Sequence, residues 1–478
     1  MADPRDKRLA TDALATEVSE LLRRHKLVEG LVHRTEQAKH DLVESLVHKQ
    51  HLTGLGSRLE SLHPADIAAL LEALPLEERL VVWNLVKAER DGEILLEVSD
   101  AVRESLIAHM ESGELVAAAE QLDADELADL APDLPREVMQ DVFKSLSTEE
   151  REQVRAAMSY PEDAVGALMD FDLVTVRDDV AVEVVLRYLR RLDEMPDHTD
   201  QVFVVTRDER LVGALPVNRL LVTDPEIEVA QVLNAEPTAF RPEDKAQDAA
   251  LAFERYDLVS APVVDGDGRL IGRVTVNTVM DYIRDKSESE LLSAGGLRDD
   301  EDLFAPVWKS MKNRWTWLAI NLVTAFIASR VIGVFEGSIE KTVALAALMP
   351  IIAGIGGNSG NQTITMIVRA LALGQLTLVN ARRLFAKELG VSVLNGLVWG
   401  SVVGLFAFLI YHNWQLGLVM TGAMVLNLML AAVMGVLIPL VLYRLGRDPA
   451  RGSSVLITAI TDSGGFFIFL GLATIFLH

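Results

Sequence analysis

Long runs of apolar residues dominate the last third of the chain, whereas the remainder shows short apolar patterns interrupted by charges. Five runs are long enough for an α-helix to cross about 30 Å of hydrocarbon, which takes about 20 residues. They are Trp315–Val334, Thr342–Ala372, Leu389–Tyr411, Leu416–Tyr443 and Val455–Leu477. Core helices of soluble proteins are usually shorter and amphipathic. The pattern therefore predicts five transmembrane helices.

The basic residues around these runs predict an orientation. With the N-terminus inside, ten Lys and Arg residues flank the spans on the inner side, and two, Arg330 and Lys341, lie on the outer side. Cytoplasmic loops carry an excess of Lys and Arg. We therefore expect the N-terminus inside and, with an odd number of spans, the C-terminus outside.

Residues 55–160 show short amphipathic helical patterns with an internal repeat. Leu62–Pro75 and Leu122–Pro135 share apolar and proline positions at an offset of 60 residues. Self-similarity at a fixed offset is typical of stacked helical hairpins. The pattern predicts an α-helical superhelical domain (an α-solenoid), preceded by a helical extension over residues 1–54.

A second repeat follows, in which Val202–Leu221 matches Ala261–Met280 at an offset of 59 residues. Each copy reads as strand, polar hairpin, strand and helix, after an earlier strand and helix. This doublet resembles a tandem pair of CBS motifs, α/β modules that serve as dimerising sensors or as purely structural dimerisers. The predicted segments are 1–54, 55–160, the CBS pair 161–284, a connecting, plug-like helix 285–313, and the five-helix transmembrane domain 314–478.

Charge divides the chain in the same way. Residues 1–302 hold 33 basic and 65 acidic side chains, a net of −32, whereas residues 303–478 hold 12 and 5, a net of +7. An acidic surface opposes nucleic-acid binding. The chain has no cysteine, so disulfides and thiolate sites are excluded. The first 30 residues lack the apolar core of a secretory signal. The whole reads as an integral membrane protein with a large acidic cytoplasmic part.

Asp462 lies within the last apolar run. An acid at the bilayer centre costs about 2.5–3.5 kcal/mol even on the lenient insertion scale, so it normally faces a cavity or a partner. Thr458 and Gly465 share its helical face. The alternative is a position near the inner interface, since Arg451 lies only 11 residues earlier.

The second run contains PIIAGIGGNSGNQ, residues 350–362. Proline and four glycines predict a break in the helix, and three amides add polar groups. Irregular backbone at membrane depth occurs only where it is buried in protein or lines a water-filled cavity. The alternative is close helix packing through Gly356 and Gly360.

Carbonyls, amides and one carboxylate together form an all-oxygen lining, which suits a hard cation. Mg²⁺ takes one or two carboxylates and keeps several waters. One aspartate per chain is few for an ion, but a two-fold dimer would bring two copies of Asp462 together.

With these parts in this order, the chain resembles the MgtE family of Mg²⁺ channels or transporters over residues 55–478. The most specific segments are residues 350–362, 366–374, 382–390, 448–450 and 461–462. The resemblance implies a homodimer in the cell membrane with five helices per chain around a central pore. It implies that Asp462 is the pore carboxylate, that Gly357, Asn358 and Asn361 lie along the pore, and that the Ala346 carbonyl is on the ion path.

The resemblance also implies that the cytoplasmic domains sense internal Mg²⁺. Bound ions would hold acidic faces together and close the pore, because close carboxylates repel unless a divalent ion bridges them. The acidic residues at matching positions are Glu93, Asp125, Asp129, Asp281 and Glu290.

Other positions depart from the family pattern. Residues that are typically acidic are here Lys245, Gln247, Asn277, Thr278, Lys286 and Ser289. Fewer carboxylates predict weaker or shifted Mg²⁺-dependent closure. The CBS position that usually offers an aspartate to a nucleotide ribose is Thr278 in one repeat and Arg219 in the other, which argues against adenine-nucleotide binding.

The sequence therefore predicts passive Mg²⁺ transport, driven by the membrane potential. No P-loop and no catalytic triad signature is present, so we do not expect an enzyme. Two alternatives stay open: a transporter of Co²⁺, Ni²⁺ or Mn²⁺, and a membrane-anchored CBS sensor that transports nothing.

Overall fold

The computed structural model describes most of the chain as two compact units. The described residues are Thr16, Val18, 54–192, 194–298, 301–372, 375–376, 378–449 and 452–477. The first unit comprises Met1–Lys286 with Asp302–Ala305, and the second comprises Ser287–Glu301 with Pro306–His478. The helical extension predicted for residues 1–54 lies almost wholly outside the described residues.

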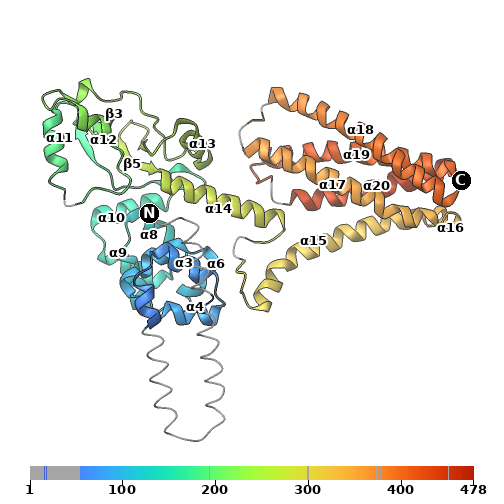
Figure 1. Ribbon diagram of the computed structural model, residues 1–478, viewed down its shortest axis with the longest axis horizontal. Coiled ribbons are helices and arrows are strands. Elements are labelled where there is room, and N and C mark those ends of the chain that lie inside the picture. Colours follow the sequence, from blue (N-terminus) through green and yellow to red (C-terminus); the bar gives the residue numbers. More distant parts are fainter. Residues whose placement is uncertain are drawn as a thin grey trace, which may run out of the picture. The chain divides into compact units, whose positions relative to one another are not determined.

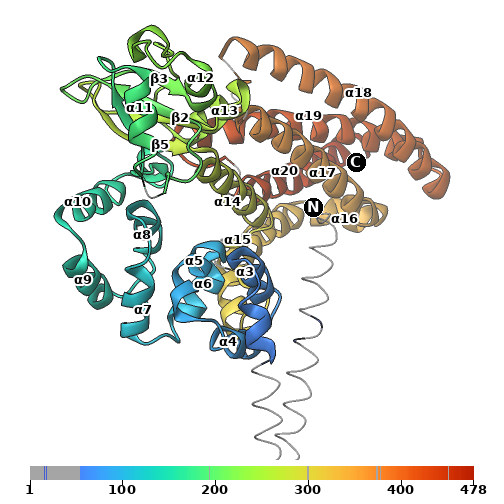
Figure 2. The ribbon, with the colours of Figure 1, turned by 60° about the vertical axis from the view of Figure 1, so that its left-hand side comes forward.

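The first part of the cytosolic unit is a curved array of short helices (Figure 2). They are α3 (Pro64–Glu72), α4 (Leu76–Trp83), the 3₁₀ turn η1 (Ala88–Arg90), α5 (Asp91–Glu97), α6 (Asp100–Ile107), α7 (Ser112–Ala119), α8 (Ala124–Leu130), α9 (Arg136–Ser145) and α10 (Thr148–Ala157). We call this array, residues 54–160, the N domain. Its core is a single cluster of buried leucines, valines and isoleucines.

The helices of the N domain start at a regular interval. When η1 and α5, which follow each other directly, are counted as one helical segment, the N-cap residues are His63, Pro75, Lys87, Ser99, Glu111, Asp123, Pro135 and Ser147, each 12 positions after the last. Capping boxes are present at the N-termini of α7, α8 and α10, where side chains accept hydrogen bonds from backbone N–H groups that have no partner within the helix. The 60-residue offset in the sequence equals five of these steps. The repeating unit is therefore one short helix with its turn, not a 60-residue block.

Two buried arginines brace this array at equivalent places. Arg79 Nε donates to the Leu71 carbonyl at 2.9 Å, and Arg103 Nε donates to the Leu95 carbonyl at 2.8 Å. Both bonds satisfy carbonyls at the ends of α3 and α5. Arg79 also forms a two-pronged contact with Asp302, at 2.9 and 3.3 Å, which ties the segment before the first long apolar helix to the N domain.

The second part of the cytosolic unit is the α/β doublet expected from the 59-residue repeat. Its elements are η2 (Val165–Leu168), β1 (Thr175–Arg177), α11 (Val182–Leu189), β2 (Gln201–Val205), β3 (Leu211–Pro216), α12 (Val217–Val222), η3 (Val229–Gln231), α13 (Ala246–Tyr256), β4 (Ser260–Val264), β5 (Leu270–Thr275) and α14 (Val276–Ala294). Strand order is β1-β2-β3 in one sheet and β4-β5 in the other. The antiparallel pairs β2/β3 and β4/β5 start at positions 59 apart.

The two halves of the doublet meet through equivalent residues. The Leu211 amide donates to the Gly268 carbonyl, and the Leu270 amide donates to the Glu209 carbonyl, both at 3.0 Å. Each donor and each acceptor is related to its counterpart by the 59-residue offset. Glu209 and Gly268 also share a left-handed backbone, with φ of 61° and 79°. The halves are thus related by a local two-fold axis.

The connecting segment 285–313 is not one helix, contrary to our prediction. It contains the end of α14 and the start of α15 (Val307–Val334). Helix α14 stops at Ala294, where Gly296 takes a φ of 75°. The Leu297 amide then donates to the Leu292 carbonyl at 2.9 Å, the bond of a Schellman cap.

The second unit is built from long helices, α15, α17 (Ala344–Ala372), α18 (Leu378–Tyr411), α19 (Trp414–Arg444) and α20 (Ser453–Leu477), with the short α16 (Glu336–Lys341) (Figure 1). Among the described residues, four of them, α15, α18, α19 and α20, are long and apolar enough to cross a membrane. Helix α17 has 29 residues but is less apolar, because glycines and amides fill its middle. Four of the five predicted spans therefore meet this criterion.

The break predicted in the second span is absent, because α17 is continuous through Pro350 and all four glycines. Pro350 lies near the start of the helix and removes one N–H, the one that would pair with the Ala346 carbonyl. Gly356 and Gly360 face neighbouring helices at close range. Tertiary packing thus stabilises a helix that its residues alone disfavour.

The Arg79–Asp302 contact should contribute strongly to the stability of the cytosolic unit. The Arg79 side chain is fully buried and that of Asp302 is 9% exposed. Asp302→Ala leaves a buried guanidinium without its partner, which typically costs about 3–5 kcal/mol. We expect a loss of that size in denaturant unfolding of the full-length protein in detergent.

The exposed pair Lys144–Asp141, 2.7 Å apart, provides the control. Asp141→Ala should cost about 0–1 kcal/mol, the range of surface ion pairs. Equal losses for Asp302→Ala and Asp141→Ala would contradict the structural role of the buried pair.

Candidate functional site

The structure brings four of the five predicted sensing acids onto one side of the N domain. Asp125 and Asp129 lie on α8, Glu93 on α5 and Asp281 on α14. Burial raises the pKa of Asp125 to about 7, and the nearby carboxylate of Asp170 adds to the shift. Burial also raises the pKa of Glu126, and Asp123 and Glu93 contribute to that rise. This side of α8 is therefore crowded with like charges.

The other end of α8 faces the start of α14. Burial raises the pKa of Asp129, against the opposing effect of Arg103, and the carboxylate of Asp285 raises it further. The Asp281 pKa is likewise raised by burial, partly offset by Arg284, with Asp129 among the groups that repel it. Arg103 Nη1 lies 3.3 Å from Asp129 Oδ2 and neutralises part of this charge.

Glu290 is the fifth predicted acid. It lies on the part of α14 that belongs to the second unit, whereas the other four belong to the first. Among the described residues, no three His, Asp or Glu side chains are arranged to hold a metal ion. The acidic residues of one chain crowd together without forming a coordination shell.

The CBS halves show why Thr278 differs from a ribose-binding aspartate. Its hydroxyl donates to the Thr275 carbonyl at 3.0 Å and accepts from the Thr275 amide at 3.3 Å, and the Thr278 amide donates to Thr275 Oγ1 at 3.4 Å. Asn277 Nδ2 lies 2.5 Å from His198 Nε2. These side chains already bond within the protein.

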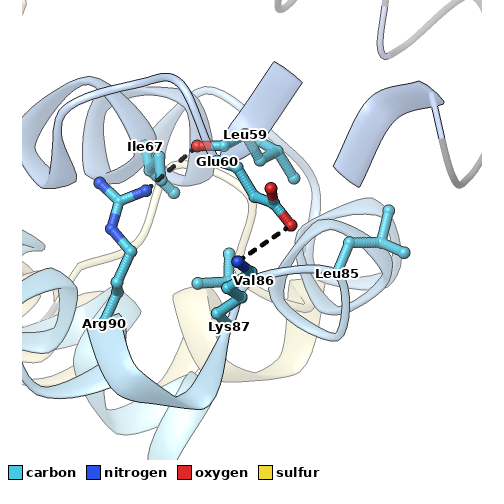
Figure 3. A pocket seen from close by; sticks show the side chains of 7 residues that line it. All are labelled: Leu59, Glu60, Ile67, Leu85, Val86, Lys87 and Arg90. Carbon is cyan, nitrogen blue, oxygen red and sulfur yellow. Dashed lines mark hydrogen bonds and ion pairs between the residues drawn. The ribbon is translucent and has the colours of Figure 1, made fainter. Parts of the chain in front are cut away.

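A small cavity in the N domain is part of the packing (Figure 3). It has a volume of about 10 Å³ and is bordered by the ion pair Lys87–Glu60, 3.4 Å apart, and by Arg90, which donates to the Leu59 carbonyl. That is room for about one water molecule. The cavity is too small for a ligand.

In the second unit, α17 has two distinct faces. Gly356 and Gly360 are buried against α19 and α20, and a methyl group added at Gly360 would overlap Ile457. The opposite face carries amides and ends in a guanidinium. Helix α17 thus combines close glycine packing on one side with a polar face on the other. The glycine packing is the alternative that the sequence analysis gave for this segment.

The polar face of α17 borders an open hollow of about 670 Å³. Its lining residues are Asn358, Asn361, Gln362, Thr365, Met366 and Arg369. Asn361 and Met366 are half-buried and the other four are exposed in the single chain. Ala346 lies in the first turn of α17, away from the stripe, and its carbonyl lacks the helical N–H donor that Pro350 cannot supply.

Asp462 lies on α20, the helix that packs against α17. It is half-buried, and among the described residues no hydrogen-bond or ion-pair partner contacts it. The preceding Thr461 is fully buried, and its hydroxyl donates to the Ile457 carbonyl at 2.8 Å. A methyl group added at Gly357 would lie 3.8 Å from Thr461 Oγ1. Gly357 and Asp462 are therefore close in the fold, on adjacent helices.

Sequence reasoning missed two buried polar residues of this unit. Asn427 is fully buried in the middle of α19, and Glu388 is buried in α18, where Thr363 Oγ1 donates to Glu388 Oε2 at 3.4 Å. Lys387 Nζ lies 3.6 Å from the other carboxylate oxygen. In the sequence, Asn427 is marked only as a single amide within a long apolar run, and Glu388 only as a single acid at the edge of another apolar run.

Three family models match the chain in succession. Residues 62–163 match the MgtE intracellular N domain, residues 229–285 the CBS domain, and residues 349–472 the MgtE divalent cation transporter model. These matches confirm the N domain, the CBS domain and the helical membrane domain expected from the sequence.

Individual proteins show the same likeness. The magnesium transporter MgtE of Thermus thermophilus is 34% identical over 430 residues, which cover 88% of this chain and 94% of that protein. The magnesium transporter MgtE of Bacillus subtilis is 25% identical over 422 residues, with the same coverage. A crystal structure of the cytosolic domain of the Mg²⁺ channel MgtE in complex with ATP is 32% identical, covers 50% of this chain and 98% of that one, and has a TM-score of 0.45.

The resemblance stated from the sequence motifs is confirmed by these matches. The relatives are transporters rather than enzymes, as expected. The likeness extends over both units, from the intracellular N domain to the membrane helices. The chain thus belongs to the MgtE family of magnesium transporters.

Proposed function

We propose that this chain is a passive Mg²⁺ channel or transporter of the cell membrane that works as a homodimer. The observation that carries the proposal is the polar face of α17, which no described residue of the second unit covers and which lies on a helix that packs against α20, the helix that bears Asp462. Hydrocarbon cannot solvate amides or a guanidinium. That face must therefore meet water or a second protein surface.

A second copy of the chain can supply a protein surface opposite this face and enclose water between the two. In a two-fold dimer the same surface patch meets itself, so two polar α17 faces would enclose a water-filled path. Two copies of Asp462 would then lie near the axis. Asn358, Asn361 and Gly357 would border the path, and the free carbonyl of Ala346 would lie toward one of its ends.

The chemistry of this lining favours Mg²⁺. Four of its six residues, Asn358, Asn361, Gln362 and Thr365, offer side-chain oxygens. Mg²⁺ binds through one or two carboxylates while it keeps most of its water. The membrane potential supplies the energy, because a double charge gains about 4.6 kcal/mol per 100 mV.

The membrane topology of the chain depends on whether α17 crosses the membrane as a fifth helix. Shielded by a second copy, α17 can cross the membrane with the four apolar helices, and five spans place the chain termini on opposite sides. The intracellular N domain of the family and the ten inner basic residues support an inside N-terminus. The C-terminus is then outside.

The cytosolic acids would regulate the path. Glu93, Asp125, Asp129 and Asp281 repel one another in the absence of a divalent ion, and Mg²⁺ between them would favour a compact, closed state. Glu290 would contribute from its own unit. Lysines at 245 and 286 reduce the negative charge, so we expect closure at higher Mg²⁺ than a fully acidic interface requires.

Asp462→Asn should abolish Mg²⁺ uptake into liposomes that contain the purified full-length protein. The amide keeps the shape but removes the charge that holds the hydrated cation, so we expect at least a tenfold loss. Glu340→Gln, which neutralises an exposed acid on α16, is the matched control and should transport normally. Full uptake by the Asp462 variant would place the ion path elsewhere.

The cysteine-free chain allows a direct test of the water-filled face. Asn358→Cys, on the polar face of α17, should react with a charged, membrane-impermeant thiol reagent in intact membranes. Leu397→Cys, on the exposed apolar surface of α18, should not react because lipid covers it. Equal labelling of both cysteines would argue against a hydrated path along α17.

The cytosolic unit should lose stability as pH rises. The pKa of Asp125 is about 7 in the folded chain against 3.8 for an isolated side chain, so the folded state binds the proton more tightly. The stabilising effect of that proton is complete below about pH 4 and is lost as pH rises through 7. In Mg²⁺-free buffer, Asp125→Asn should raise the Tm of this unit by about 2–4 °C at pH 8, the shift given by about 1 kcal/mol in a domain of this size.

At pH 5 the same variant should have a smaller effect, and Mg²⁺ should reduce the gain at pH 8. Asp265→Asn is the control, because backbone donors lower the pKa of Asp265 and its loss should not stabilise the fold. A Tm difference for Asp125→Asn that is the same at pH 5 and pH 8 would contradict the electrostatic account.

A further inference from the structure

Asn427 is a fully buried amide at the centre of the membrane unit. It is on α19, and the buried residues around it on that helix are mostly apolar, among them Met424, Leu428 and Ala431. Among the described residues its Oδ1 accepts no hydrogen bond. A buried polar atom without a partner is costly. An apolar side chain of similar size would fill the same space without that cost, so packing alone does not account for an amide here.

The other end of the amide is firmly held. Asn427 Nδ2 donates to the Ile352 carbonyl at 3.0 Å. That carbonyl lies in the α17 turn immediately before Gly356. The bond joins α19 to α17 next to the start of the polar face.

Two glycines form a notch around this side chain. A methyl group at Gly465 on α20 would lie 2.7 Å from Asn427 Nδ2, and one at Gly356 on α17 would overlap the same atom. The carboxamide therefore fills the gap between α17 and α20. Any larger residue at either glycine would push it out or force the helices apart.

The position of the notch connects it to the residues of the path. Gly356 adjoins Gly357 and is two positions before Asn358, and Gly465 is one helical turn after Asp462. The Asn427 amide thus lies on the side of α17 that faces away from Asn358, and it lies beside the face of α20 that Gly465 shares with Asp462. Its size and its hydrogen bond set how far apart those two helices stand.

We propose that Asn427 is a positioning residue that fixes the spacing between Asp462 and the amide face of α17, and so determines selectivity for Mg²⁺ over the larger Ca²⁺. The inference rests on the proposed ion path. Mg²⁺ requires near-ideal octahedral geometry and keeps its waters, whereas Ca²⁺ accepts longer and more variable contacts. A fixed gap favours the first ion, and a gap that can widen admits the second.

The test measures Mg²⁺ and Ca²⁺ uptake separately in liposomes that contain the full-length protein. Asn427→Ala should lower the ratio of Mg²⁺ to Ca²⁺ uptake severalfold, mainly by raising Ca²⁺ entry. Asn395→Ala, which removes an exposed amide on the neighbouring α18, should leave the ratio unchanged. An unchanged ratio in a folded Asn427→Ala protein would overturn the inference.

A second variant keeps the test decisive if Asn427→Ala does not fold. Gly465→Ala displaces the same carboxamide from the α20 side and should also lower the ratio. In the double variant Gly465→Ala/Asn427→Ala the two changes should not add, because the second removes the group with which the first collides. Fully additive effects would contradict a shared notch.

The outcomes separate this inference from the function on which it rests. If Asp462→Asn abolishes uptake and the Asn427 variants keep the wild-type ratio, the positioning role alone fails. If Asp462→Asn transports normally, the ion path itself is wrong, and the inference fails with it.

Discussion

Hydrocarbon offers no hydrogen bonds, and the membrane unit is organised around that constraint. Helix α17 carries amides and an arginine along one side for about three turns, a surface that lipid cannot cover. Every other feature of the proposed path depends on how this surface is satisfied. In the proposed dimer, water and a second copy of the chain satisfy it together, and the hydrated groups provide oxygen ligands for Mg²⁺.

Glycines make the two-faced helix possible. Gly356 and Gly360 let α19 and α20 approach the side of α17 that faces away from the amides. The same approach brings Gly357 close to Thr461, the residue before Asp462. The cytosolic unit, in contrast, holds groups that repel one another. The fold keeps acids of α8 and α14 near one another, and Arg103 offsets only part of their repulsion. Such a surface responds to any ion that neutralises it.

The sequence predicted the parts of this molecule that depend on local pattern. The apolar runs, the 59-residue repeat and the acidic N-terminal part correspond to helices and strands of the structure. The predicted break in α17 was wrong because proline and glycine weaken a helix on average, whereas here close packing against α19 and α20 stabilises it. The 12-residue period of the N domain was missed although the sequence carries it, because the position before each cap is apolar in all eight repeats, from Leu62 and Leu74 to Leu134 and Leu146.

The sites that were missed depend on three-dimensional contacts. Nothing near Asn427 in the sequence reveals that two glycines, on two other helices, surround it. Glu388 likewise gains its buried contact from Thr363, 25 residues earlier. Glu290 shows the reverse case, since its motif suggests a shared site but the fold assigns it to the other unit. Residue type predicts which chemistry is possible, and only packing decides which groups meet.

The central claim is that two copies enclose a hydrated path between their α17 faces, beside Asp462. An experimental map of the purified protein in a lipid environment with Mg²⁺ tests it most directly. We predict a two-fold dimer in which the amides of the two α17 helices face each other across water, with density for a hydrated cation next to the paired Asp462 side chains. A map in which lipid or another helix covers α17, and in which Asp462 contacts no cation, would contradict the account.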